Sequence, residues 1–214
     1  MRRALRGTLA TLVCGLAFAS TVTAGTAAAE FTASASPSET GLSFNPDGNA
    51  GQCVGTRQQW APSPDWTNAV LVDTDSRSGG CLLAFGVRDL DSNLAGLALN
   101  YRWQVSPGGN AGQCGNQGEF PVPITASQIL GPNVKVDTDD RGGYCNLTFS
   151  MAGRTDVSLD VRFWPEYVDG KDQCVNYLPK EEWHSVRPGA PITIGMNTDS
   201  RHGGCYFSLR LRQF

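Results

Sequence analysis

Closely spaced carboxylates are the residues of this chain that most suggest chemistry, because they recur in one short motif. The motif occurs at 73–81 (Asp-Thr-Asp-Ser-Arg-Ser-Gly-Gly-Cys), at 137–145 (Asp-Thr-Asp-Asp-Arg-Gly-Gly-Tyr-Cys) and at 197–205 (Asn-Thr-Asp-Ser-Arg-His-Gly-Gly-Cys). An EF-hand loop also needs an oxygen ligand at its fifth position and a glutamate at its twelfth. Here the fifth position is Arg77, Arg141 or Arg201, whose charge opposes a divalent cation. We therefore expect no metal site.

We interpret the motif as a turn that an ion pair between a carboxylate and the arginine holds in place. Asp-Thr-Asp supplies acceptors for nearby backbone amides, and the following glycines accept a positive φ. The turn residues are Asp73, Asp75, Arg77, Asp137, Asp139, Arg141, Asn197, Asp199 and Arg201.

Catalytic residues are few. The two histidines, His184 and His202, accompany no recognisable nucleophile motif, and Cys-x-x-Cys and glycine-rich phosphate loops are absent from the sequence. Paired carboxylates of a glycosidase leave no local pattern, so a secreted hydrolase using Asp73, Asp75 or Asp139 is an alternative. Because the motif is repeated in every copy, it suits a scaffold better than one active site. We expect a protein without catalytic activity or cofactor.

Tryptophans offer a second alternative, carbohydrate binding, because exposed indoles can stack on sugar rings. Trp60, Trp66 and Trp183 lie in expected loops, whereas Trp103 and Trp164 fall in or at the end of expected strands and are predicted to be core residues. Threefold repeats are common among lectins, so a lectin-like protein is the alternative to a protein-binding one.

The first 29 residues predict export. Three arginines precede an apolar run over 9–19, and an Ala-rich stretch ends before Glu30, which is typical of a cleaved signal peptide. We expect a secreted, extracellular protein without membrane insertion. Residues 30–214 keep 14 of the 17 cationic side chains against 20 anionic ones, a net charge near −6. This charge argues against a nucleic-acid partner.

Six cysteines remain, and the repeats predict their pairing. A Gln-Cys motif ends at Cys53, Cys114 and Cys174, and the motif described above ends at Cys81, Cys145 and Cys205. Since each copy of about 60 residues owns one cysteine of each kind, the simplest pairing lies within copies: Cys53 with Cys81, Cys114 with Cys145, and Cys174 with Cys205. Each bridge closes a loop of about 30 residues and contributes about 3–4 kcal/mol.

Apolar residues at every second position predict strands on both sides of each turn, so that each turn is expected to join a β-hairpin. The cysteine of each turn continues this alternation and is expected to face the core. Together with a strand near 97–105 and another over 157–164, this predicts an all-β fold of about twelve strands. Either packed β units or a closed β-trefoil-like assembly accommodates them.

We assign residues 1–29 to the signal peptide, 30–43 to an extended N-terminal arm, 44–97 to repeat 1, 98–157 to repeat 2 and 158–214 to repeat 3. The arm is small and polar, which is typical of a disordered leader. It is also a candidate for docking on a partner, with Phe31 and Leu42 as apolar anchors.

The signal peptide, the small-residue arm and the repeated cysteine motifs resemble the adaptor subunit of umbrella toxin particles. The resemblance implies a connector that joins a lectin-bearing subunit to a large ring-forming toxin subunit in particles used against competing bacteria. A connector of this kind has a disulfide-stabilised body, no active site and at least two docking surfaces. The sequence therefore favours a secreted adaptor in protein–protein interaction within a toxin complex.

Overall fold

The computed structural model describes residues 38–73, 79–137, 143–166, 173–175, 178–197 and 203–214. These residues contain sixteen strands and two single-turn 3₁₀ segments, Ala50–Gln52 (η1) and Ala111–Gln113 (η2), and no α-helix. The all-β fold with three disulfides is thus as predicted. There are more strands than the twelve expected, because the two-residue strands at the Gln-Cys motifs are too short to show an alternating pattern.

The strands form three sheets. Sheet I has the order β3-β1-β5-β10-β7, with β9 beside β5: β1 (Ser38–Gly48), β3 (Gln58–Pro62), β5 (Gly79–Asp89), β7 (Cys114–Gly115), β9 (Ile124–Thr125) and β10 (Val134–Asp137). Sheet II has the order β13-β15-β11-β6-β8: β6 (Ala98–Val105), β8 (Gly118–Pro121), β11 (Tyr144–Ala152), β13 (Cys174–Val175) and β15 (Ile192–Asn197). Sheet III has the order β14-β12-β16-β4-β2: β2 (Cys53–Val54), β4 (Val70–Asp73), β12 (Val157–Pro165), β14 (Trp183–Val186) and β16 (Gly204–Gln213).

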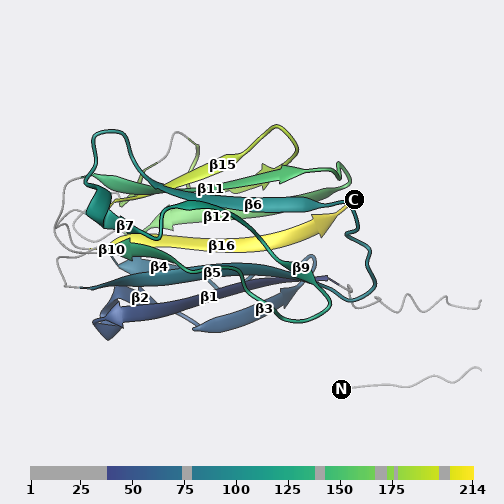
Figure 1. Cartoon of the computed structure of the whole chain (residues 1–214), viewed down its shortest axis with the longest axis horizontal. Helices are drawn as coiled ribbons and strands as arrows, with labels where there is room; N and C mark the ends of the chain where they lie inside the picture. The colour runs from purple at the N-terminus through teal and green to yellow at the C-terminus, as the bar shows by residue number, and fades with distance from the viewer. Residues whose placement is uncertain (1–37, 74–78, 138–142, 167–172, 176–177, 198–202) are drawn as a thin grey trace, which may run out of the picture. The chain divides into compact units, whose positions relative to one another are not determined.

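Each sheet combines strands from two different parts of the chain. In sheet I, β1, β3 and β5 pair with β7 and β10, which follow later in the sequence; in sheet III, the C-terminal strands β12, β14 and β16 pair with β2 and β4. Figure 1 shows the blue β4 beside the yellow β16, and Val72 there pairs with Cys205. Each sheet therefore contains strands from two repeats, and the pairing of β4 with β16 connects the first repeat with the last.

The expected hairpins at the Asp-x-Asp motifs are wrong. β4 and β5 flank residues 74–78 but belong to sheets III and I; likewise β10 and β11 lie in sheets I and II, and β15 and β16 in sheets II and III. Alternation predicts which residues of a strand are buried but not which strand lies beside it. Of the turn residues, Asp73, Asp137 and Asn197 end β4, β10 and β15, whereas Asp75, Arg77, Asp139, Arg141, Asp199 and Arg201 lie outside the described residues.

The disulfides join Cys53 to Cys81, Cys114 to Cys145 and Cys174 to Cys205, the pairing expected within each copy. Each bridge connects two sheets: III to I, I to II, and II to III. All six cysteines are buried, and for Cys81, Cys145 and Cys205 the alternation predicts this. The bridges lie within the repeats of the sequence, as expected, but each one joins two sheets, and together they connect the three sheets in a ring.

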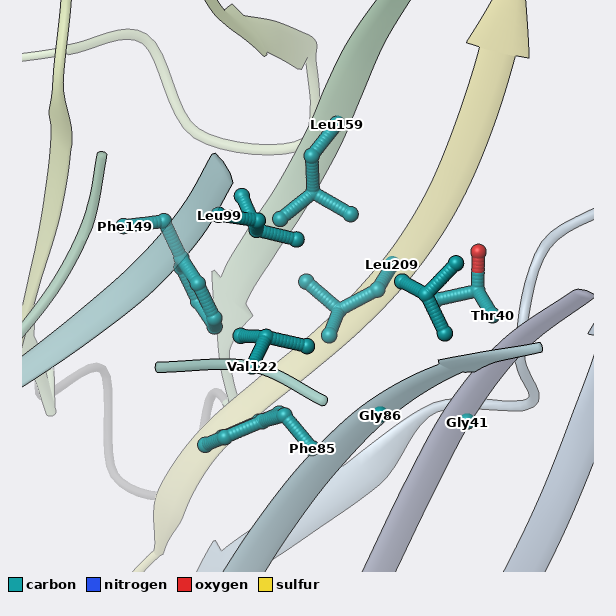
Figure 2. A pocket seen from close by; sticks show the side chains of 10 residues that line it. Thr40, Gly41, Phe85, Gly86, Leu99, Val122, Phe149, Leu159 and Leu209 are labelled. Carbon is teal, nitrogen blue, oxygen red and sulfur yellow. The ribbon is translucent and has the colours of Figure 1, made fainter. Parts of the chain in front are cut away.

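One apolar core lies between the inner faces of the sheets. Phe85 of sheet I contacts Phe149 of sheet II with ring centroids 5.0 Å apart, and Phe207 of sheet III at 6.4 Å. A small cavity of about 10 Å³ is lined by residues of all three sheets, and Figure 2 shows the side chains around it. Thr40 borders this cavity at the register position that Leu99 and Leu159 occupy in the other two sheets.

The boundary of the N-terminal arm needs correction. Leu42, the predicted apolar anchor for a partner, lies in β1 and is fully buried between Thr40 and Phe44 of the same inner face. The alternation over 40–44 matches that of β6 and β12, but the polar residues around it hid the pattern. Residues 38–43 are thus part of sheet I, and Phe31 lies outside the described residues.

Candidate functional site

The described residues of the repeated sequence motifs have structural roles. Asn49 and Asn110 cap η1 and η2 by accepting hydrogen bonds from Gly51 and Gly112, and the glutamine of each Gln-Cys pair is buried. The glycines that follow the Asp-x-Asp motifs, at positions 79, 143 and 203, all have φ near +100°. The strands before and after each Asp-x-Asp motif belong to different sheets, and the described part of the chain contains no cluster of three metal-ligating side chains.

The outer faces of the sheets differ at matching register positions. In sheet I, Gly41 faces Gly86, and the indole of Trp60 covers both. In sheet II the corresponding pair is Asn100 and Ser150. In sheet III it is Asp160 and Arg210. Sheets I and II thus have no charged pair at this position, which is specific to sheet III.

Asp160 is a fully buried carboxylate on the outer face of sheet III. Its Oδ2 lies 2.9 Å from Arg210 Nε and 2.5 Å from Arg212 Nε, and its Oδ1 accepts hydrogen bonds from Ser158 Oγ at 2.9 Å and Ser185 Oγ at 2.7 Å. Burial alone would raise the pKa of Asp160, but the hydrogen bonds from Ser185, Arg210, Ser158 and Arg212 outweigh it and hold the pKa below its usual range. The carboxylate therefore stays ionised and serves as an anchor for both arginines.

Arg210 connects this anchor to two tryptophans. Its Cζ lies 4.3 Å from the ring centroid of Trp183 in β14, and the Trp183 ring lies 6.2 Å from that of Trp66, at an interplanar angle of 48°. Trp66 is 59% exposed. The backbone beside it is fixed, since Thr67 N donates to Leu209 O at 2.8 Å and Leu209 N donates to Thr67 Oγ1 at 3.0 Å. The strand exchange thus brings together tryptophans that are 117 positions apart in the sequence.

Further arginines and aromatic rings extend this surface. Arg162 lies over the ring of Trp164 at 5.0 Å, and Trp164 stacks on Tyr206 at 5.4 Å. Arg187 and Arg212 both lie over Phe214, at 5.2 and 5.0 Å. We call the whole set the arginine–aromatic face; it comprises Trp66, Asp160, Arg162, Trp164, Trp183, Arg187, Tyr206, Arg210, Arg212 and Phe214.

The locations predicted for the tryptophans are correct for some of them and wrong for others. Trp103 is fully buried, as expected for the core. Trp164, expected in the core as well, is half-buried on the outer face, because it follows the outward-facing Arg162 by two residues in β12. Trp60 and Trp183 lie in strands rather than loops; Trp60 covers sheet I, whereas Trp66, in a loop as predicted, lies close to Trp183.

Among the described residues, the histidine and carboxylate candidates do not come together in an arrangement of nucleophile, base or paired acids. His184 contacts Phe163 and hydrogen-bonds to the Pro179 carbonyl oxygen at 2.6 Å. Asp73 ends β4 in a half-buried position, and His202 and the other suspected carboxylates, Asp75 and Asp139, lie outside the described residues. Asp160 is closed to a substrate, because side chains of the protein occupy both its oxygens.

Sequence reasoning missed Asp160, Arg210, Arg212, Arg162 and Arg187. A comparison of the repeats position by position contains a signal, since Asp160 aligns with Gly41 and Asn100, and Arg210 aligns with Gly86 and Ser150.

No protein-family model, curated protein or solved structure matches this chain. Within the described residues, no helix has the length and apolar character needed to cross a membrane. The three buried disulfides indicate an oxidising environment of the extracellular kind.

Proposed function

We propose that the protein is a secreted, non-catalytic adaptor that binds a protein partner through the arginine–aromatic face. The observation that carries this proposal is the difference between matching positions of the three sheets: sheet III carries Asp160 and Arg210 where sheet I has two glycines. Tryptophan, tyrosine and arginine are the residues most enriched in the energetically dominant centres of protein interfaces. Rigid support beneath them lowers the entropy lost on binding.

The N-terminal sequence and the disulfides also support the proposal that the adaptor is secreted. Residues 1–29 have the composition of a signal peptide, and the disulfides suit a protein that works outside the cell. We propose that the assembly is a toxin particle used in competition between bacteria, as the resemblance to the umbrella toxin adaptor implies. A second docking surface, such as the segment that precedes β1, would complete a connector.

Affinity purification of the tagged protein from the culture supernatant of the producing organism tests the adaptor proposal. We expect a stoichiometric partner with the unaltered protein and with Arg102→Ala, which changes an exposed arginine on sheet II. Trp66→Ala should weaken capture about 30-fold, corresponding to about 2 kcal/mol. Recovery of the protein alone, or equal capture by Trp66→Ala, would contradict the proposal.

Carbohydrate binding is a second candidate, favoured by the Trp66 and Trp183 rings, which lie 6.2 Å apart with one largely exposed. Such a pair can receive the apolar face of a sugar ring. A glycan array probed with the purified protein tests it: binding that Trp66→Ala abolishes supports the lectin, and no signal across a broad array counts against it. The adaptor ranks first because Asp160 has no free oxygen for a sugar hydroxyl.

A further inference from the structure

The arginine–aromatic face has more positive charge than its own carboxylates neutralise. Arg210 and Arg212 share the single carboxylate of Asp160. Arg162 donates through Nε to the Glu181 backbone oxygen at 2.8 Å, and neither Arg162 nor Arg187 forms an ion pair within the part of the chain that the structure describes. Within the face, four guanidinium groups therefore accompany the one carboxylate of Asp160, while Glu166 and Asp73 lie at its edge, near Tyr206.

Of the cations elsewhere in the described residues, several form one-to-one ion pairs, whereas the exposed Arg57 and Arg102 form no ion pair there and lie over no aromatic ring. Arg88 pairs with Glu39 at 3.0 Å, Lys135 with Asp47 at 2.6 Å, and Arg154 with Asp156. The surplus on sheet III is also opposite in sign to the molecule, since residues 30–214 carry 14 cationic against 20 anionic side chains. A surplus that opposes the overall charge does not serve general solubility.

The arginines are also held ready to bind. Trp164 supports Arg162, and Phe214 supports Arg187, through cation–π contacts that leave the terminal NH₂ groups of these two guanidinium planes available for hydrogen bonds. Those groups match carboxylates in bidentate geometry. Glu181 and Glu182, at the margin of the face, are exposed and form no ion pair with these arginines.

We infer that the partner docks on the arginine–aromatic face with an acidic polypeptide segment, whose carboxylates meet Arg162 and Arg187 while an apolar side chain packs on Trp66. This inference rests on the proposed adaptor function and specifies the chemistry of its partner. Charge complementarity of this kind raises the rate of association and makes binding sensitive to salt.

Two labelled ten-residue peptides test the inference by fluorescence anisotropy: glutamates around one tryptophan, and glutamines around one tryptophan. We expect the glutamate peptide to bind at least about tenfold more tightly, a difference of about 1.4 kcal/mol, and to weaken as salt rises from low to high. Arg162→Glu/Arg187→Glu should abolish this preference. Arg57→Glu/Arg102→Glu, a matched control that changes the net charge equally at exposed sites outside the arginine–aromatic face, should retain it.

Equal affinity for the two peptides, or equal loss in the control variant, would overturn the inference. Capture of the partner by the two variants distinguishes a failure of this inference from a failure of the adaptor proposal. If Trp66→Ala loses the partner but Arg162→Glu/Arg187→Glu keeps it at all salt concentrations, the adaptor stands and the acidic segment is wrong. A glycan that competes with the partner for Trp66 would likewise overturn the acidic segment.

Discussion

Asp160 is an ionised carboxylate without solvent exposure, held by side chains from three adjacent strands of sheet III. Burying such a charge costs several kcal/mol unless ion pairs and hydrogen bonds satisfy it. Here Ser158, Ser185, Arg210 and Arg212 supply them all. The ion pair that offsets the cost of burying Asp160 also fixes the position of Arg210 against Trp183. Both the stability of the fold and the geometry of the arginine–aromatic face therefore depend on Asp160.

Asp160→Asn should lower the free energy of unfolding by about 2–3 kcal/mol at pH 7. Breaking a buried ion pair costs about 3–5 kcal/mol, and the partial exposure of Arg210 and Arg212 reduces that figure. Urea unfolding measures the change. Ser158→Ala is the control; it removes one neutral donor and should cost about 1 kcal/mol. A loss below that of Ser158→Ala would contradict the assigned role.

The contribution of Asp160 should also depend on pH in a defined direction. Since its pKa is lowered in the folded protein, the stabilisation is fully present above the pKa of the unfolded chain, near 3.8, and is lost as pH falls through the folded value. The difference in unfolding free energy between the unaltered protein and Asp160→Asn should therefore be constant from pH 7 to about pH 5 and shrink below about pH 4. A difference that persists unchanged at pH 2 would contradict it.

Thr40 is a polar residue at a leucine position of the core. Its Oγ1 is buried and forms no hydrogen bond with the described residues, and the cavity beside it is lined by apolar groups. Thr40→Val keeps the shape and removes the unsatisfied hydroxyl, so it should raise the free energy of unfolding by about 1 kcal/mol. In Thr148→Val, the matched control, the lost hydroxyl pairs with Thr193 Oγ1 at 2.8 Å, and stability should fall. Thermal unfolding of both variants distinguishes these outcomes.

Among the structural elements, the strands that follow the Asp-x-Asp motifs have a glycine of positive φ at or just before their first residue. Gly79 has φ +109°, and a Cβ there would lie 2.2 Å from the Asp47 carbonyl oxygen of β1. Gly79→Ala should therefore cost about 3 kcal/mol or more, from backbone strain together with steric overlap. Gly189→Ala is the control, because φ is +77° there but no atom lies within 4 Å; about 1 kcal/mol is expected. Equal effects in urea unfolding would show that the overlap relaxes.

The same elements show how far the sequence could predict the fold. Residues such as Val70, Val72, Leu83 and Phe85 were identifiable as buried, because period-two alternation fixes the face of a strand. The sheet to which each strand belongs could not be predicted, because β4 and β5 flank the same Asp-x-Asp motif but pair with β16 and β1, respectively. Partner choice is decided by the packing of the whole unit, on which local patterns carry little information.

The candidate site was less accessible to sequence reasoning than the fold. Trp66 and Trp183 were identifiable as single residues, but their proximity follows from the pairing of β4 with β16. Asp160 and Arg210 lie on neighbouring strands 50 positions apart and belong to no motif. Only the expected register of strands within a repeat would have placed these two side chains opposite each other.

At the scale of the whole unit, strand exchange and disulfides connect the same sheets in the same cyclic order. β7 and β10 join sheet I although β6, β8 and β11 lie in sheet II, and the bridge from Cys114 to Cys145 connects these two sheets covalently. No sheet is therefore complete with strands from one third of the chain. We infer that the three sheets fold and unfold together, since separating one breaks the pairing in the others.

This cyclic arrangement predicts that the three bridges are equivalent in stability. Their sequence separations are 28, 31 and 31 residues, so chain entropy assigns about 3–4 kcal/mol to each. Paired replacement of Cys53/Cys81, Cys114/Cys145 or Cys174/Cys205 by serine should thus lower the unfolding free energy by similar amounts, each in one cooperative transition. Urea unfolding followed by two spectroscopic probes measures both features, and peptide mapping without reduction verifies the remaining bridges. If one pair produced a separate early transition, the sheet that it anchors would be an independent unit, because in a closed ring the loss of any one bridge leaves all three sheets joined through the other two.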